Sequence, residues 1–208
     1  MRKTLIPLIL IVLMLVASTL AESSEGIGAT SGTCGASLTW EVKDGALTIT
    51  DTGTMKNYTS SSGAPWESVK SSITTIVVAS GATTIGDYAF YGCTNLTSIS
   101  LPSTVKTIGN DSLASCSKLA SIILPSKLTS LGEYAFSSCG SLRTIKLPST
   151  LKTIGQNCFS DSGLRSITIP DSVEEIGRNA FYHCNSLEKI VFPNDLITIP
   201  NYKSIEQI

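Results

Sequence analysis

Apolar residues recur along this chain in a unit of about 23 residues, with one step of 22. The unit reads L-x-x-I-x-L-P-S-x-V-x-x-I-G-x-x-A-F-x-x-C, and its slots keep their register through five copies. In successive copies the first apolar residue is Ile73, Leu96, Leu119, Leu142, Leu164 and Leu187. Self-similarity at a fixed period of this length predicts a repeat architecture in which each copy is one structural unit.

The first part of each unit predicts a short β-strand. Its apolar residues stand at offsets zero, three and five, with polar and β-branched residues between them, so one face of the strand is apolar. Proline ends the strand, the glycine is expected to mark a corner by adopting a conformation closed to other residues, and A-F-x-x-C predicts one helical or 3₁₀-like turn. Because one coil cannot bury its own apolar face, the copies are expected to stack about 4.8 Å apart around one continuous core.

The segment before the repeats has two parts. Arg2 and Lys3, the apolar run 5–16 and small residues up to Ala21 predict a secretory signal over residues 1–21. The alternative is an uncleaved membrane anchor, which is disfavoured because the run is shorter than the ~20 residues of a spanning helix. Either reading places the rest of the chain outside the cytosol.

Residues 22–72 predict a β cap. Leu38, Trp40 and Val42 alternate with polar residues, Leu47 and Ile49 do the same, and a turn at 43–45 separates the two runs. This pattern is typical of a β-hairpin. A hairpin at this place is expected to cover the open core of the first coil, as the terminal units of repeat proteins must.

The repeat unit resembles the leucine-rich repeats of the BspA-like surface proteins of bacteria and protists, over residues 73–208. The segment from Ser31 to Trp66 is similar to the amino-terminal cap of such arrays. The resemblance implies a repeat solenoid: a leucine-rich-repeat right-handed superhelix with short parallel strands and short helical or 3₁₀ turns, preceded by a β-hairpin cap. It also implies a secreted or cell-surface location and adhesion through binding of extracellular matrix proteins or other cells.

The array, residues 73–208, holds five full repeats and a partial sixth. The sixth unit begins at Leu187, but Pro200 takes its glycine slot and Ser204 its aromatic slot. A short family member, a truncated copy, or a last coil sealed by self-association all fit this departure. Self-association through an uncapped carboxyl end would make the chain a self-assembling structural surface protein, and that alternative stays open.

Composition and charge argue against several classes of binding partner. The chain is 15% charged with a formal net charge of −1, and about a quarter of it is Ser and Thr. A near-zero balance without basic runs argues against nucleic acid or an anionic membrane as the general partner. The single histidine excludes metal sites that need two imidazoles, so we expect no metal and no cofactor.

Most of the cysteines share one repeat slot. Cys93, Cys116, Cys139 and Cys184 occupy it, Ser162 fills it in the fourth unit, and Cys158 lies in the alanine slot. Stacked slot-mates about 5 Å apart lie within the Cα range of a disulfide. A ladder of buried free thiols is the favoured interpretation, because Ser162 shows that the slot requires a small side chain rather than a bond.

Enzymatic sites find little support. His183 would have to serve as the only imidazole base, and with its neighbour Cys184 it supplies only two of the ligands that a structural metal site needs. The acidic residues Asp161, Asp171, Glu174 and Glu175 are interpreted as a solvated coil edge. An extracellular carbohydrate-active enzyme therefore remains the less favoured alternative, and we predict that the protein is not an enzyme.

The outward side of the strands is the predicted interaction surface, which we call the strand face. Side chains at offsets two and four point away from the core and stack into two files. The first file is Thr75, Ser98, Ser121, Thr144, Ser166 and Lys189, and the second is Val77, Ser100, Ile123, Lys146, Thr168 and Val191. One interpretation is that these hydroxyls are merely small, strand-compatible residues that bind water.

A basic cluster of Arg143, Lys146 and Arg165 interrupts the hydroxyls. A rigid face with one charged patch is what a protein-binding module presents. We therefore predict that a protein ligand contacts these three residues together with Ser121, Thr144, Ser166, Thr168 and Lys189.

Three N-glycosylation sequons begin at Asn57, Asn95 and Asn110. They are candidate glycosylation sites if the host modifies secreted proteins.

Overall fold

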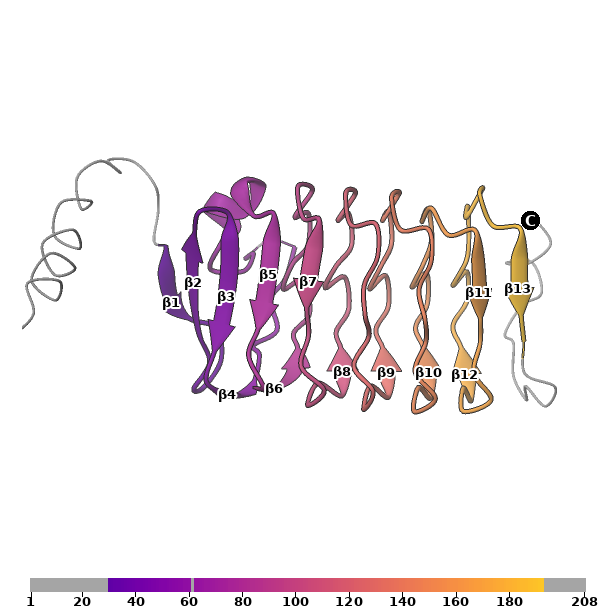
Figure 1. Ribbon diagram of the computed structural model, residues 1–208, viewed down its shortest axis with the longest axis horizontal. Helices are drawn as coiled ribbons and strands as arrows, with labels where there is room; N and C mark the ends of the chain where they lie inside the picture. Colours follow the sequence, from indigo (N-terminus) through magenta and orange to yellow (C-terminus); the bar gives the residue numbers. More distant parts are fainter. Residues whose placement is uncertain (1–29, 61, 193–208) are drawn as a thin grey trace, which may run out of the picture.

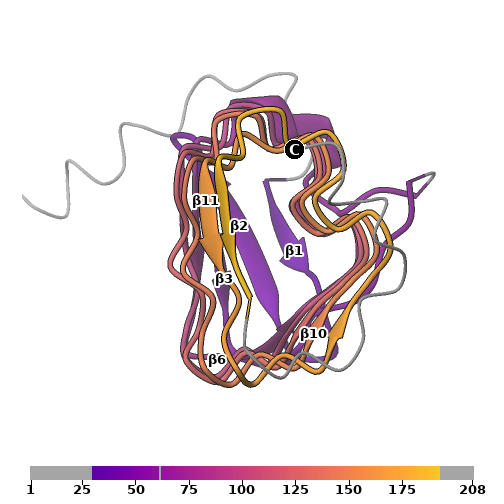
Figure 2. The same cartoon turned by 90° about the vertical axis from the view of Figure 1, so that its right-hand side faces the viewer.

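The computed structural model describes residues 30–60 and 62–192 as one elongated stack of coils (Figure 1). The coils superimpose when the stack is viewed along its length, with β11 and β10 on different walls of the coil (Figure 2). The expected signal segment 1–21 and the sixth unit from residue 193 onward lie outside the described residues. Within the described ranges, no helix is both long and apolar enough to cross a membrane.

The first sheet joins the amino-terminal hairpin to the first two repeat strands. In spatial order its strands are β1 (Ser31–Thr33), β2 (Thr39–Lys43), β3 (Ala46–Thr50), β5 (Thr75–Val78) and β7 (Ser98–Ser100). β2 and β3 pair antiparallel as expected, and Asp44 (φ 49°) and Gly45 (φ 78°) supply the left-handed residues of their turn. After the 3₁₀-helix η1 (Glu67–Ser72), β5 pairs in parallel with β3, so the hairpin continues the repeat sheet.

A second parallel sheet runs along another wall of the stack. Its strands, in chain order, are β4 (Thr52–Thr54), β6 (Gly81–Ile85), β8 (Thr107–Ile108), β9 (Ser130–Leu131), β10 (Thr153–Ile154) and β12 (Glu175–Ile176). The sequence pattern predicted one strand per unit and missed this sheet. Most of its strands are only two residues long, and so short a segment shows no alternation that sequence reasoning detects.

The strand face is less regular than the second sheet. β7 ends the first sheet, and β11 (Ser166–Thr168) and β13 (Lys189–Val191) form a separate pair. Between them, the strand segments 119–124 and 142–147 form no regular ladder: isolated bridges join Ile123 to Lys146 and Thr144 to Ser166, and single hydrogen bonds run from the Arg143 N–H to the Ala120 carbonyl and from the Arg165 N–H to the Arg143 carbonyl. The backbone ladder is therefore interrupted in the middle of the strand face.

The repeat glycines have a different role from the one expected. They do not adopt positive φ; left-handed residues lie instead two positions later, as at Tyr134 (φ 55°) and Asn157 (φ 52°). A Cβ on Gly155 would lie 2.5 Å from the carbonyl carbon of Gly132 in the preceding coil, and one on Gly132 would lie 2.6 Å from the nitrogen of Asn110. Glycine is required because the backbones of successive coils approach too closely for any side chain.

The A-F-x-x-C segment is a tight turn closed by a single i→i+3 hydrogen bond, as from the Cys116 N–H to the Leu113 carbonyl at 3.3 Å, and not a continuous helix. Tyr134 and Ser138 (φ 57°) are both left-handed, which breaks any helix between them. The Phe136 N–H donates instead to the Cys158 carbonyl of the next coil, at 2.8 Å. A second backbone ladder thus runs through the turns along the axis of the stack.

One continuous core extends from Cys34 to Leu187, as predicted. The rings of Phe136, Phe159 and Phe181 stack on one another with centroids 5.6 Å apart at both steps. Towards the hairpin, Leu113 fills the slot between Phe136 and Phe90, and Trp66 stacks on Phe90 with centroids 5.8 Å apart. The hairpin and the repeats therefore share a single hydrophobic interior.

Candidate functional site

The two predicted outward files exist wherever the coils are paired. Thr75 lies opposite Ser98, Thr144 opposite Ser166, and Ser166 opposite Lys189. In the second file, Lys146 lies beside Ile123, and Thr168 lies opposite Val191. Ser121, which no bridge involves, is exposed like Thr144, Ser166, Thr168 and Lys189. Five of the eight predicted contact residues thus lie in these paired files: Thr144, Lys146, Ser166, Thr168 and Lys189.

The three basic residues come from two successive coils. The Arg165 N–H donates to the Arg143 carbonyl at 3.0 Å, which places the two arginines in the same slot of adjacent coils. The Arg143 guanidinium donates one hydrogen bond from Nη1 to the Gly163 carbonyl at 3.3 Å. Among the described residues, the charged groups of Arg165 and Lys146 have neither a hydrogen bond nor an ion pair. Two exposed like charges on backbones about 4.8 Å apart disfavour each other, so an anion bound at this slot is stabilised.

Two depressions open beside Lys146, in the interrupted part of the strand face. The large depression, about 730 Å³, lies over the carboxyl ends of three strand segments and has a mostly apolar lining. The small depression, about 370 Å³, lies towards β11. Lys146, Leu147 and Pro170 line both, so the two are adjacent. Both volumes fall within the range of ligand-binding clefts.

Ile123 is the most exposed large apolar residue in this region, with 88% of its surface accessible. It lines the large depression, and its bridge partner is Lys146. The sequence analysis placed Ile123 in the outward file without assigning it a role. An isoleucine in an outward slot that holds serine in the preceding coil and lysine in the next was the available signal.

A carboxylate borders the basic cluster. The Glu188 N–H donates to the Arg165 carbonyl at 2.9 Å, so Glu188 occupies the next position in the arginine slot. Glu188 forms no ion pair with Arg165 in the described part of the chain. The sequence analysis chose Arg143 and Arg165 from this slot for their positive charge and did not consider the carboxylate that follows them in the next coil.

The cysteines form the buried thiol ladder that the sequence analysis favoured over disulfides. All six are unpaired and buried, and the Cys139 thiol donates to the Leu113 carbonyl of the preceding coil at 3.2 Å. Cys116 and Cys184 make the same bond to Phe90 and Phe159, at 3.3 and 2.9 Å. Burial raises the pKa of Cys93 and of Cys139 to about 12, so these thiols stay protonated and unreactive.

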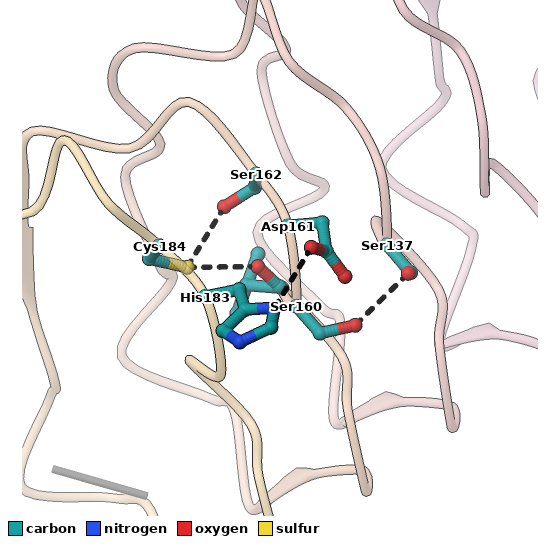
Figure 3. Close-up of polar contacts among 7 residues, drawn as sticks. Ser137, Ser160, Asp161, Ser162, His183 and Cys184 are labelled. Carbon is teal, nitrogen blue, oxygen red and sulfur yellow. Dashed lines mark hydrogen bonds and ion pairs between the residues drawn. The ribbon is translucent and has the colours of Figure 1, made fainter. Parts of the chain in front are cut away.

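Asp161 and His183 form an exposed pair on the turn wall (Figure 3). The His183 Nδ1 lies 3.4 Å from Asp161 Oδ1, and the imidazole ring stacks on Tyr182. The nearby Ser160 hydroxyl is hydrogen-bonded to Ser137, and the Cys184 thiol donates to the Phe159 carbonyl. Neither group bonds to the imidazole, so this cluster lacks the nucleophile-to-base hydrogen bond of acyl-transfer sites.

The acidic residues do not converge on a site. Glu174 pairs with Lys152 of the preceding coil, and Asp171 and Glu175 are exposed. Over residues 30–60 and 62–192, no group of three or more His, Cys, Asp or Glu side chains is placed to hold a metal ion.

The three sequon asparagines make hydrogen bonds between coils. Asn57 Oδ1 accepts from the Asp87 N–H at 3.0 Å, and Asn110 Oδ1 accepts from the Glu133 N–H at 2.8 Å. Asn95 donates from Nδ2 to the Ser71 carbonyl at 2.7 Å. These contacts give the asparagines a structural role, and their glycosylation stays a prediction.

Comparison with known proteins agrees with this geometry. The profile of the BspA type leucine rich repeat region matches residues 68–188 and 142–203, in six copies. The chain belongs to the BspA-type leucine-rich-repeat family. No curated protein matches the chain.

Three solved structures show how this member of the BspA-type family relates to others. A leucine-rich repeat protein from Eubacterium ventriosum is 32% identical, with a TM-score of 0.71 over 80% of this chain and 45% of that one. The T. pallidum leucine-rich repeat protein is 26% identical, with a TM-score of 0.58 over 77% of this chain and 82% of that one. A leucine-rich cell surface protein from Faecalibacterium prausnitzii, 23% identical with a TM-score of 0.53 over 79% and 55%, shows the fold alone. The chain thus spans about half the length of the first and third of these proteins.

Proposed function

We propose that this protein is a secreted or cell-surface adhesin that binds other extracellular proteins through its strand face. One observation carries the proposal: exposed cations that have no ion-pair partner among the described residues lie on the same face as an apolar depression, and Lys146 lines that depression. Arg165 and Lys146 are the clearest examples, in a chain whose formal net charge is −1. Charge and apolar surface close together on a rigid wall are the elements from which protein interfaces are built.

Family and fold support the same function. The BspA-type family and the name of the Faecalibacterium prausnitzii structure, a cell surface protein, fit a surface location for this chain as well. The stacked coils are ordered before any ligand arrives, so association costs little conformational entropy at this surface.

The test is binding of the purified secreted protein to immobilised extracellular matrix glycoproteins. The variant Arg143→Ala, Lys146→Ala, Arg165→Ala removes the basic cluster. A matched control, Lys56→Ala, Lys106→Ala, Arg178→Ala, removes the same charge from exposed residues outside the strand face. We expect binding that the first variant loses and the control keeps. Equal binding by both variants contradicts the strand-face assignment, and no binding by the folded wild type contradicts the adhesin function.

A further inference from the structure

We infer that the strand face takes an acidic peptide segment that also carries apolar side chains. The carboxylates of this segment would lie over Arg165 and Lys146, and an apolar side chain would enter the large depression. This inference rests on the proposed function and names the chemistry of the partner.

Within the repeat coils, the charge on the strand face is confined to the carboxyl-terminal three. At offsets one, two and four, the coils that begin at Ile73, Leu96 and Leu119 carry no charged residue. The next three coils carry Arg143, Lys146, Arg165 and Lys189 at these offsets, against the single carboxylate of Glu188. An anionic partner therefore makes its charge–charge contacts with the carboxyl-terminal coils. Over the first three coils it meets only uncharged side chains at these offsets.

The slot shared by Arg143 and Arg165 is incomplete without an anion. The two residues follow one another along the stack, and within residues 30–60 and 62–192 only Arg143 has a hydrogen bond from its guanidinium, to a single carbonyl. Four of the five N–H donors of Arg143 and all five of Arg165 have no protein partner in that part of the chain, and a carboxylate accepts such donors in pairs. A carboxylate bound at this slot accepts hydrogen bonds from the guanidinium N–H groups and also reduces the repulsion between the two arginines.

The apolar lining of the large depression favours an acidic peptide over a sulfated glycan as the anionic ligand. Its walls include Ile123, Leu124, Leu147, Pro148 and Pro170, with Lys146 at the boundary to the small depression. A sulfated glycan satisfies the cations but leaves this apolar surface in water. A peptide that alternates carboxylates with leucine or phenylalanine covers both, because burial of apolar area adds to the charge contacts.

The probe is a short synthetic peptide in which two leucines are separated by Asp-Glu pairs, labelled with fluorescein and titrated with the full secreted protein. Two matched peptides replace either the leucines by serine or the acids by their amides. A heparin-derived oligosaccharide serves as the glycan probe. Fluorescence anisotropy gives each Kd at low and at high salt.

We expect measurable binding of the parent peptide and at least about tenfold weaker binding of each matched peptide. The variant Arg143→Ala, Lys146→Ala, Arg165→Ala should bind the parent at least about tenfold more weakly, and high salt should have a similar effect. Ile123→Ser, which changes an 88% exposed side chain and so leaves the core intact, should weaken it about fivefold. The control Lys56→Ala, Lys106→Ala, Arg178→Ala should bind as the wild type does.

Other results overturn the inference. Equal binding of the leucine and serine peptides shows that the large depression is not used. Tight binding of heparin alone, insensitive to Ile123→Ser, makes the ligand an anionic glycan. If matrix glycoproteins bind through the basic cluster and the parent peptide fails to compete, the adhesin function stands and the acidic peptide is wrong. If no matrix protein binds but the peptide does, only the adhesin function fails.

Discussion

The strand face and the opposite side of each coil are held together in different ways. On what we call the stacked side, the second sheet, the glycine slot and the A-F turn continue without a break from the hairpin to β12. On the strand face, β5 and β7 of the first coils join the three cap strands in one sheet, β11 and β13 form another, and isolated bridges lie between the two sheets. Ile123, the two depressions beside Lys146 and the basic cluster lie on this interrupted wall, whereas a depression of about 470 Å³ over the second sheet has no such cluster among its lining residues.

The difference separates stability from recognition. The stacked side determines how closely the coils approach, because two backbone ladders and the close glycine contacts fix the distance between successive backbones. Fewer backbone contacts between coils are formed on the strand face, so its outward side chains can differ in charge and size without changing the spacing of the coils. The predictions below test this division, from the largest effect to the smallest.

Removing an aromatic ring from the stacked side should have the largest effect. Phe159 is fully buried between the rings of Phe136 and Phe181. Phe159→Ala should lower the free energy of unfolding by about 4 kcal/mol, because it leaves a cavity that its neighbours cannot fill. Phe159→Leu, which copies Leu113 in the same slot of an earlier coil, should cost about 1.5 kcal/mol or less. Urea unfolding followed by circular dichroism measures both, and equal losses would refute the role of the ring stack.

Adding one methyl group to the glycine slot should come next. Gly155→Ala places a carbon 2.5 Å from the backbone of Gly132, so the two coils must separate and weaken the ladders on both sides. We expect a loss of about 3 kcal/mol in the same unfolding assay. Gly140→Ala is the matched control, because a Cβ there meets no atom within 4 Å and φ is not positive. A harmless Gly155→Ala would show that the coils tolerate wider spacing.

High pH should destabilise the protein through its buried thiols. Burial raises the pKa of Cys93 and Cys139 from the ordinary value of 9.0 to about 12. Because the folded pKa lies above the unfolded one, the stabilising contribution is complete below pH 9.0 and is lost as the pH rises towards 12. Melting temperatures between pH 7 and 11 should fall less steeply for Cys93→Ala, Cys139→Ala than for the wild type.

Thiol reactivity gives an independent reading of the same burial. With a disulfide reagent at pH 8, the native thiols should react at least about a hundredfold more slowly than those of the urea-unfolded chain. All six cysteine thiols should react with the reagent once the chain is unfolded. Fewer than six would mean that some cysteines are oxidised, which contradicts the free-thiol ladder.

Removing charge from the strand face should have the smallest effect on stability. Among the described residues, the charged groups of Arg143, Lys146 and Arg165 make a single hydrogen bond, from Arg143 to the Gly163 carbonyl. Replacing all three by alanine removes that bond and also relieves the repulsion between the arginines. We expect the free energy of unfolding to change by no more than about 0.5 kcal/mol. A large decrease would mean that the cluster stabilises the coil rather than binding a partner.

Several elements of the fold followed from local patterns. The apolar offsets of each unit predicted the repeat strands and the files of outward side chains, because slot-mates in a stack must meet. The alternation around residues 43–45 likewise predicted the β2–β3 hairpin. The basic cluster was found for the same reason, since offsets in the unit convert directly into neighbours along the stack.

Other elements depended on contacts that no single unit displays. The second sheet consists mostly of two-residue strands, and the glycine slot is dictated by the backbone of the preceding coil. The depressions were missed because they arise from the positions of several coils at once. The residue pattern of one repeat unit does not tell how far apart the backbones of neighbouring coils lie.

The amino-acid sequence alone determined the repeat period, the buried slots and the family, because burying apolar side chains requires the same residue types at the same offsets in every coil. Only the tertiary structure decided how closely the coils approach, where the strand ladder is interrupted and which cations remain without partners. Those features depend on hydrogen bonds and close contacts between residues about 23 positions apart, whose geometry exists only once the coils are stacked.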